Sequence, residues 1–212
     1  VMISSIGKRT TYILCSIILI LVTSCATLPN GSKNWSENAL KKLSLREKIG
    51  QMLIYRMNMR LKDISLSKWK EIVDLINSDG LGGIHLWYGE ASSSLTIMNK
   101  MQDMSKIPIL FDADIEYGLH QRFPKGTDLL PLMAIAATNN PNNAYDIGKI
   151  IAKESRAVGI HWNFSPVVDV NNNPANPIIN VRSFSEDPHM VIDYGIKFMK
   201  GLQDHGMLAT AT

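Results

Sequence analysis

From residue 43 onward, short apolar runs alternate with longer stretches in which apolar residues recur at helical spacing. Short apolar runs between turn residues are typical of buried strands, and the helical spacing indicates helices with one face against a core. Strands are expected over 49–54 (or a helix leading into a strand there), 83–87, 107–111, 161–170 and 207–211. Helices are expected over 67–76, 94–104, 142–158 and 187–204.

This order makes about four strand-then-helix units and the start of a fifth, which predicts an α/β protein with a parallel sheet. Two architectures compete at this point: an open doubly wound sheet and a closed eight-stranded barrel. No Gly-x-Gly-x-x-Gly follows the first expected strand, which weakens a nucleotide-binding interpretation. Pro166 within the fourth expected strand indicates an edge or a bend.

The N-terminus has a different pattern. Lys8 and Arg9 precede an apolar run over 12–22 and then small residues up to Cys25, which predicts a secretory signal over 1–25. The apolar run is too short to span a bilayer comfortably. The signal also resembles the bacterial lipoprotein type, in which the cysteine becomes the lipidated first residue of the mature chain. An ordinary signal peptidase site with an incidental Cys25 is the alternative.

Residues 26–38 are polar and turn-rich, which predicts a tether over 26–42 between the anchor and a domain over 43–212. Cys15 would leave with the signal, so no cysteine remains after Cys25 for a disulfide, a thiolate metal site or a nucleophile. We therefore expect an exported protein of the cell envelope, held at a bacterial membrane by a lipid on Cys25.

Composition and charge exclude several classes of protein. The 212 residues are 45% hydrophobic and 19% charged, which excludes disordered, collagen-like and disulfide-framework chains. Without Lys8 and Arg9, 20 basic residues face 19 acidic ones, a net charge of +1. We expect no nucleic-acid partner, because a chain with so little excess positive charge lacks the basic surface that binds nucleic-acid phosphates. A neutral, hydroxyl-rich substrate suits it at least as well as a charged one.

Polar side chains gather where the expected strands end. Asp114 and Glu116 follow the third strand, Asp169 ends the fourth, and Arg182 comes shortly after it. Ligands of parallel α/β proteins lie at the carboxyl ends of the strands. Carboxylates, arginines, amides and aromatic rings are the groups that bind sugar hydroxyls and stack on sugar faces. These residues are therefore candidates for a sugar site.

Two of the candidates have structural alternatives in ion pairing. Asp114 directly after an apolar run is hard to explain by packing, but it could cap a helix or pair with Arg122. Arg182 could pair with Glu186 or Asp187 at the surface, although its apolar flanks weaken that interpretation.

Other candidates have alternatives in packing and capping. Asp169 could equally cap the Asn-rich turn that follows it. His85 and Trp87, at the end of the second strand, are more often core or rim residues than ligand contacts. No cluster has metal-ligand spacing and no Gly-x-Ser-x-Gly elbow is present, so we expect neither a metal nor a cofactor.

Several ordered motifs resemble glycoside hydrolase family 3. Residues 107–118 with Arg122 are similar to its Asp-x-Glu-x-Gly…Arg segment. Residues 159–174 and 179–188 resemble its Asn-Phe-(Ser/Ala)-Pro-Val-x-Asp and Arg-Ser-Phe motifs, and 201–206 resembles the end of its next helix. The family's catalytic domain is a β/α barrel. The resemblance therefore implies the N-terminal part, about strands 1–5, of a TIM-type (β/α)8 barrel.

The resemblance also implies site residues and a substrate. Asp114 and Arg122 are expected to bind hydroxyls of the nonreducing sugar, and Arg182 to bind the same sugar. Glu116 and Asp169 stand in the motifs without a defined role. The Asp-Val-Asn-Asn-Asn-Pro and Val-Arg-Ser-Phe forms are more similar to the β-N-acetylhexosaminidase branch than to the β-glucosidase branch.

The family continues with Lys-His-Phe-Pro-Gly-His-Gly where this chain has Thr212 at the Lys position. The His/Asp acid/base pair and the nucleophilic Asp are therefore expected outside these residues, which leaves no catalytic residue in this chain and predicts that it is inactive alone. The full-length protein is expected to hydrolyse terminal β-linked N-acetylhexosamine by a retaining two-step mechanism. The alternatives are a β-glucosidase or β-xylosidase of the same family, and a non-catalytic sugar-binding half-barrel.

Overall fold

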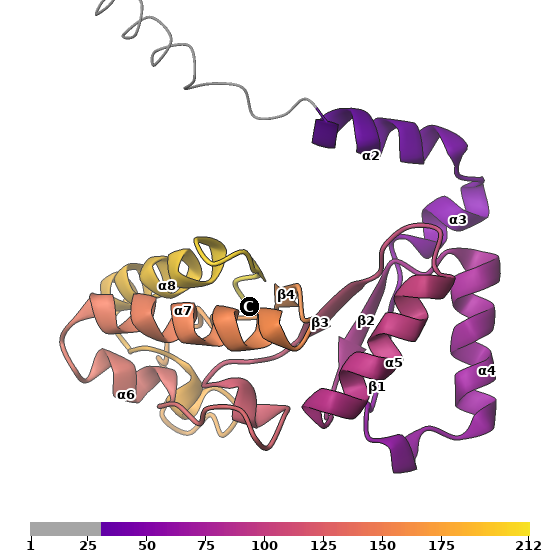
Figure 1. Ribbon diagram of the computed structural model, residues 1–212. Helices are drawn as coiled ribbons and strands as arrows, with labels where there is room; N and C mark the ends of the chain where they lie inside the picture. Colours follow the sequence, from indigo (N-terminus) through magenta and orange to yellow (C-terminus); the bar gives the residue numbers. More distant parts are fainter. Residues whose placement is uncertain (1–30) are drawn as a thin grey trace, which may run out of the picture. The chain divides into compact units, whose positions relative to one another are not determined.

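The computed structural model describes residues 31–212 (Figure 1). The chain divides into two compact units, residues 1–43 and 44–212. In the first unit the described residues form helix α2 (Gly31–Lys42), whose last turn carries Lys41 and Lys42, where cations complement the helix dipole. The turn-rich structure predicted for 26–38 is therefore wrong over 31–38, and the role of 26–42 as a tether stays a prediction. The predicted signal and Cys25 lie outside the described residues.

The second unit follows the expected alternation of strands and helices. Its strands are β1 (Ile54–Met57), β2 (Gly83–Leu86), β3 (Leu110–Ala113), β4 (Trp162–Asn163) and β5 (Leu208–Ala209). Its α-helices are α3 (Leu45–Gly50), α4 (Leu66–Asp74), α5 (Ala91–Met104), α6 (Leu132–Ala136), α7 (Pro141–Ala157) and α8 (Pro188–Gln203). Single turns η1 (Leu61–Asp63), η3 (Leu119–Gln121) and η4 (Asn180–Arg182) are 3-10 helices, and η2 (Leu75–Asp79) is a π-helix that extends α4.

The five strands are all parallel and neighbour one another in chain order, β1-β2-β3-β4-β5. Helices lie between successive strands, which is the arrangement of part of a TIM-type barrel and confirms the predicted fold class. Carboxyl ends of parallel strands share one edge of the sheet. The segments after β2, β3 and β4 are thereby brought together.

The two faces of the sheet differ in burial. On one face Ile84, Leu86 and Phe111 are almost completely buried in the core. The register aligns Arg56, His85, Asp112, Trp162 and Leu208 on the other face. This second face also exposes apolar side chains: Ile54 is 42% exposed, Leu110 40% and Leu208 53%. In a TIM barrel such alternate residues fill the barrel interior, so we refer to this face as the inner face.

Several boundaries differ from the sequence expectations. Residues 49–54 are the end of α3 leading into β1, so the second of the two alternatives is confirmed. The expected strand 161–170 is only two residues long, since the chain leaves the sheet after Asn163 and Pro166 has no N–H to donate. Helix α6 was not expected, because its five residues are too few to reveal a helical period.

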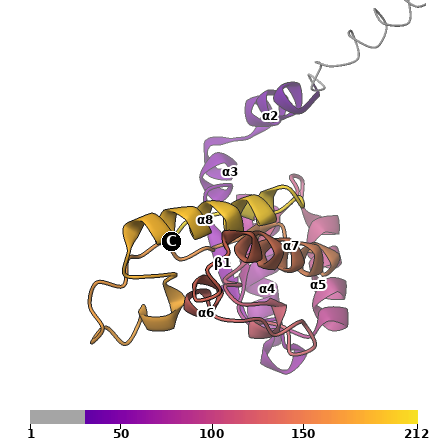
Figure 2. The same cartoon turned by 90° about the vertical axis from the view of Figure 1, so that its left-hand side faces the viewer.

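Helices α7 and α8 lie side by side in Figures 1 and 2 and approach each other through glycines. A Cβ at Gly201 would lie 2.2 Å from the Tyr145 backbone oxygen, and one at Gly148 would lie 2.4 Å from the Phe198 backbone oxygen. Backbone atoms at this distance cannot move aside without shifting a helix. The close crossing therefore depends on the missing side chains.

Replacing Gly201 by Ala is expected to lower the free energy of unfolding by roughly 2 to 3 kcal/mol, because the new methyl group overpacks the crossing. Gly195→Ala, in the same helix, is the control: its Cβ would meet only the Val168 side chain, at 3.4 Å. We expect it to change stability by no more than about 1 kcal/mol. Urea unfolding measures both, and equal effects would contradict the close approach.

His161, next to β4, makes the stability of the fold depend on pH. Its ring stacks on Phe111, and its Nδ1 accepts a hydrogen bond of 3.2 Å from the Phe111 backbone N–H. Burial, and secondarily the charge of Arg156, lower the pKa of His161 below its ordinary value of 6.5. The unfolded chain therefore takes up this proton at a higher pH than the folded chain does.

Stability is consequently expected to fall as the pH drops below about 6.5, and to level off once the folded protein is protonated too. His161→Gln should flatten this part of the curve in urea titrations between pH 7 and pH 5. His189→Gln on the exposed start of α8 should leave the wild-type pH dependence unchanged. A wild-type curve that is flat in this range would contradict the argument.

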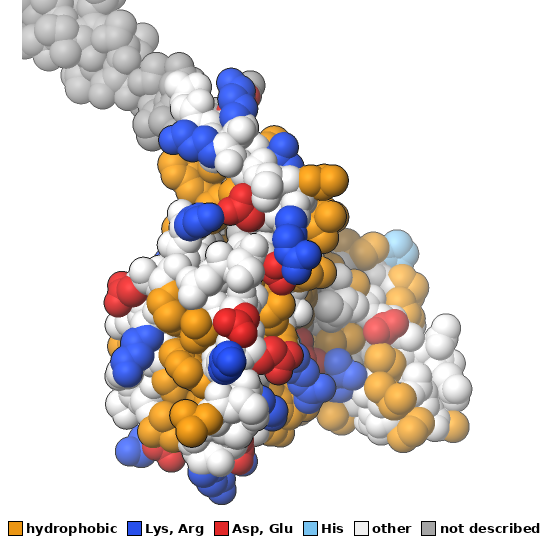
Figure 3. Space-filling view, turned by 90° about the vertical axis from the view of Figure 1, so that its right-hand side faces the viewer, with side chains coloured by type: hydrophobic (Ala, Val, Ile, Leu, Met, Phe, Trp, Pro, Cys, Tyr) orange, Lys and Arg blue, Asp and Glu red, His pale blue; other side chains and the backbone are white. Residues whose placement is uncertain are grey.

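Figure 3 shows the side of the molecule that carries α4, on which apolar side chains lie among charged ones. Leu66, the first residue of α4, is 89% exposed. Within residues 31–212, no helix combines the length and apolarity needed to cross a membrane.

Candidate functional site

Asp114 and Arg122 are held together directly after β3. Asp114 is the residue after the strand, and Arg122 follows the turn η3. The Arg122 Nη2 lies 3.3 Å from Asp114 Oδ2, and its Nε donates to the Asp114 backbone oxygen at 2.9 Å. Arg122 is buried, whereas the Asp114 side chain is 32% exposed. The ion pair considered from the sequence is therefore present, and it presents the carboxylate to solvent.

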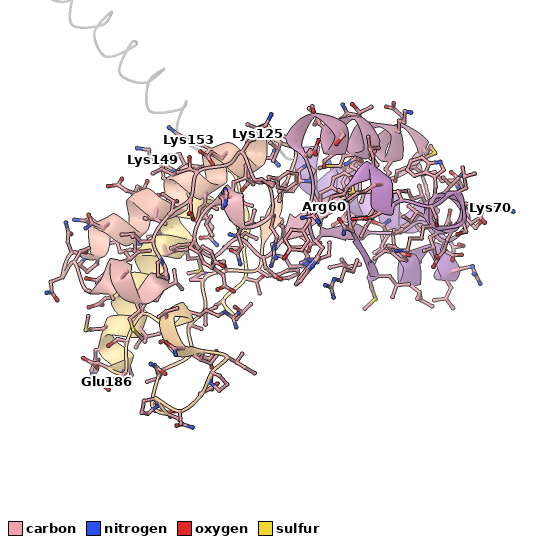
Figure 4. The ribbon with its side chains drawn as sticks, turned by 90° about the horizontal axis from the view of Figure 1, so that it is seen from below. Arg60, Lys70, Lys125, Lys149, Lys153 and Glu186 are labelled. Atoms are coloured by element: carbon pink, nitrogen blue, oxygen red, sulfur yellow. The ribbon has the colours of Figure 1, made fainter. Side chains whose placement is uncertain are left out.

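Guanidinium groups around the Asp114–Arg122 pair lie over the rings of aromatic residues at the end of β2. Arg122 lies 4.3 Å from the centre of the Trp87 ring, and Arg56 from β1 lies 3.7 Å from it. Arg60, labelled in Figure 4, lies 4.8 Å from the centre of the Tyr88 ring. Cations over aromatic faces are stabilised by the ring quadrupole. Trp87 therefore supports Arg122 as part of the rim.

Glu116 and Arg182 form a second pair. Arg182 donates from Nη2 to Glu116 Oε1 at 2.7 Å and from Nε to Oε2 at 3.0 Å. Glu116 is 4% exposed, so its charge is buried and paired in the fork geometry that suits a carboxylate. The hydrogen bond to Glu116 raises the pKa of Arg182. Glu116 thus orients Arg182, whose guanidinium remains partly exposed.

The expected surface alternative for Arg182 is wrong. Among the described residues, the carboxylate paired with Arg182 is Glu116, and Asp187 instead caps α8 by accepting from the His189 N–H at 2.9 Å. Acidic caps at helix N-termini are common, which the sequence pattern Asp-Pro already indicated for this helix.

Asp169 is an exposed residue on the segment after β4. Its backbone oxygen accepts from the Ser183 hydroxyl at 2.6 Å, which ties this segment to the end of η4, the turn that carries Arg182. Smaller Coulombic contributions of Asp114 and Asp169 also raise the pKa of Arg182. The five residues singled out from the sequence, Asp114, Glu116, Arg122, Asp169 and Arg182, therefore gather at one edge of the sheet.

A cavity of about 460 Å³ lies beside the Glu116–Arg182 pair. Tyr117, Gln121 and Asp128 contribute hydrogen-bonding groups to its lining, and Leu129 contributes apolar surface. Mixed polar and apolar walls suit a sugar, which has hydroxyl groups and apolar ring faces. In residues 31–212, no group of three His, Cys, Asp or Glu side chains is placed to hold a metal ion.

Sequence reasoning missed the role of Asp112. This acid lies in β3 on the inner face, is fully buried, and contacts His85 Nδ1 through Oδ1 at 2.5 Å. The signal was present in the spacing of Asp112 and Asp114, because residues i and i+2 of a strand share a face. His85 is accordingly paired with a carboxylate at the rim of the site.

The comparison with protein families decides the affiliation. The description "Glycosyl hydrolase family 3 N terminal domain" matches residues 44–212. This chain belongs to glycoside hydrolase family 3. The resemblance inferred from the motifs is confirmed, and the chain is part of a glycosidase family.

Two relatives match this chain over most of its length. A protein of Cellulomonas fimi named β-N-acetylglucosaminidase/β-glucosidase is 29% identical over 178 residues, covering 84% of this chain and 30% of that protein. The β-hexosaminidase A of Pseudoalteromonas piscicida is 33% identical over 152 residues, covering 66% of this chain and 25% of that protein. The chain thus spans about a third or less of these relatives.

Solved structures agree on the fold. A family 3 β-N-acetylglucosaminidase from Paenibacillus sp. str. FPU-7 superposes with a TM-score of 0.70 at 32% identity, covering 80% of this chain and 33% of that one. A β-glucoside phosphorylase superposes with a TM-score of 0.78 at 27% identity, covering 87% of this chain and 32% of that one.

Proposed function

We propose that this chain is the sugar-binding half of a β-N-acetylhexosaminidase barrel, and that the full-length protein removes terminal β-linked N-acetylhexosamine from glycans. The observation that carries the proposal is the gathering of the Asp114–Arg122 and Glu116–Arg182 pairs at the carboxyl edge of a family 3 sheet. Charge-assisted hydrogen bonds to hydroxyl groups would come from the exposed parts of Asp114 and Arg182.

The chemistry argues for binding in this segment and catalysis outside it. A retaining glycosidase needs a nucleophile and a separate acid/base group on the two sides of the glycosidic bond. Glu116 is buried in its pair with Arg182, and Asp114 is held by Arg122, so both carboxylates are engaged in orienting cations. We propose that the nucleophile and the acid/base lie in the remainder of the full-length protein.

The preference for N-acetylhexosamine over glucose is supported by the names of the Pseudoalteromonas and Paenibacillus relatives and by the Asp-Val-Asn-Asn-Asn-Pro and Val-Arg-Ser-Phe motifs, whereas the Cellulomonas relative is named for both activities. The β-glucoside phosphorylase with a similar fold makes the β-glucosidase alternative the appropriate comparison.

Initial rates with 4-nitrophenyl N-acetyl-β-glucosaminide and 4-nitrophenyl β-glucoside test the preference in the full-length protein. We expect the first substrate to have the higher kcat/KM, and the 212-residue chain alone to turn over neither. A higher kcat/KM for the glucoside would make the protein a β-glucosidase. Binding of sugar without turnover by the full-length protein would favour a non-catalytic sugar-binding module.

We further propose that the protein is exported and anchored through Cys25, supported by the charged, apolar and small-residue order of residues 1–25. Metabolic labelling with a palmitate analogue should mark the wild type in bacterial cells. A Cys25→Ala variant that labels equally would refute the anchor.

A further inference from the structure

The pair of Asp112 and His85 is not used in the sugar-binding arrangement described above. Asp112 in β3 and His85 in β2 are register partners on the inner face. Asp112 is fully buried, and its Oδ2 has no hydrogen-bond partner in the described part of the chain. A buried carboxylate with an unused oxygen is costly. The pair therefore calls for a functional explanation.

The second nitrogen of His85 faces Asp114. A carboxylate accepts hydrogen bonds, so the 2.5 Å contact with Asp112 assigns the donated hydrogen to Nδ1. This contact fixes the ring and leaves Nε2 at 3.6 Å from Asp114 Oδ2, an ion-pair distance that is attractive when Nε2 also carries a hydrogen, as it does in the doubly protonated ring. The same Oδ2 lies 3.3 Å from Arg122 Nη2. Arg122, and His85 in its doubly protonated form, therefore restrain one oxygen of Asp114 from two different elements, while Oδ1 has no hydrogen-bond partner among residues 31–212.

The three side chains form a row from the core to the solvent. The exposed fraction of the side chain rises from 0% for Asp112 to 13% for His85 and 32% for Asp114. The rings of Trp87 and Phe164, with centroids 6.1 and 5.9 Å from that of His85, limit its rotation. Because the buried Asp112 and the two rings restrict the movement of His85, His85 in turn restricts the movement of the exposed Asp114 carboxylate.

We propose that His85, supported by Asp112, is a positioning residue that orients Asp114 so that its Oδ1 accepts a sugar hydroxyl. This inference rests on the proposed function, in which Asp114 binds the sugar. Hydrogen bonds depend steeply on direction, so a carboxylate that is free to rotate binds a hydroxyl less well than one that is held.

Two conservative variants separate positioning from a structural role. The amide nitrogen of Asn falls near the place of Nδ1, and that of Gln falls near the place of Nε2. His85→Asn therefore keeps the contact with Asp112, and His85→Gln keeps the contact with Asp114. Titration calorimetry of the full-length protein with N-acetylglucosamine measures Kd, and urea unfolding measures stability.

We expect sugar affinity and stability to rank the two variants in opposite orders. His85→Gln should bind within about threefold of the wild type, whereas His85→Asn should bind about tenfold more weakly although it is the more stable of the two. An affinity that follows stability, with Asn binding better than Gln, would overturn the positioning role. Equal Kd values for both variants and the wild type would also overturn it.

Asp114→Asn distinguishes this failure from failure of the proposed function. If the wild type binds the sugar and Asp114→Asn does not, while both His85 variants bind normally, only the positioning role is wrong. If Asp114→Asn binds as the wild type does, the sugar site itself is wrong. A measurement without variants is the ¹⁵N shift of His85 Nε2 in the wild type. We expect it to change when the sugar binds, and an unchanged shift would contradict the inference.

Discussion

Replacing Asp114 by Asn is expected to lower kcat/KM of the full-length protein for 4-nitrophenyl N-acetyl-β-glucosaminide by roughly 100-fold or more. The substitution removes the charge that strengthens hydrogen bonds to sugar hydroxyls, and each such bond contributes about 1.5–3 kcal/mol. The fold should survive, because the Nε of Arg122 keeps its bond to the backbone oxygen of residue 114.

Asp103→Asn is the matched control, since Asp103 is an exposed acid on α5. It should leave kcat/KM unchanged. Circular dichroism and urea unfolding of Asp114→Asn would verify that the loss is one of binding. A folded Asp114→Asn variant with wild-type kcat/KM would remove Asp114 from the sugar site.

Replacing Arg182 by Ala is expected to lower the free energy of unfolding by about 2–3 kcal/mol, and to weaken sugar binding as well. The variant leaves the buried carboxylate of Glu116 without an ion-pair partner, because its only hydrogen bonds among the described residues are to Arg182. Removing one partner of a buried pair typically costs about 3–5 kcal/mol, and the partial exposure of Arg182 reduces this figure.

The same substitution in a Glu116→Gln background separates the stranded charge from lost packing. Because Gln carries no charge, Arg182→Ala should then cost less than about 1 kcal/mol. Urea unfolding of the wild type, the two single variants and the double variant completes the cycle. An equal cost of Arg182→Ala in both backgrounds would show that the pair does not compensate the charge of Glu116.

The fold was largely predictable because the strands of a parallel sheet are apolar runs and its helices are amphipathic. The starts of α7 and α8 carried Pro at the first position with Asn140 and Asp187 before it, so both were placed within a residue. The length of strand β4 was overestimated, because after Asn163 the chain makes only isolated backbone hydrogen bonds to its neighbours, such as that of the Val168 N–H to the Thr212 oxygen, although Val167 is buried in the core. Helix α2 was missed because its polar composition has no apolar period.

The site was predictable as a set of residues but not as a set of pairs. Strand ends pointed to Asp114, Glu116 and Asp169, because acids after buried strands are rarely packing residues. The partner of Glu116 could not be predicted, since Arg182 lies 66 positions further along the chain and only the folded sheet brings the two together. The role of Asp112 was missed because its spacing to Asp114 indicates a shared face but does not reveal that His85 on the neighbouring strand is its register partner.

A crystal structure of the full-length protein with bound N-acetylglucosamine tests the central claim most directly. The account predicts that hydroxyl oxygens of the sugar lie within about 3.2 Å of the Asp114 carboxylate and of the Arg182 guanidinium, at the carboxyl edge of the sheet. A sugar bound elsewhere, with Asp114 and Arg182 still engaged only with Arg122 and Glu116, would contradict it.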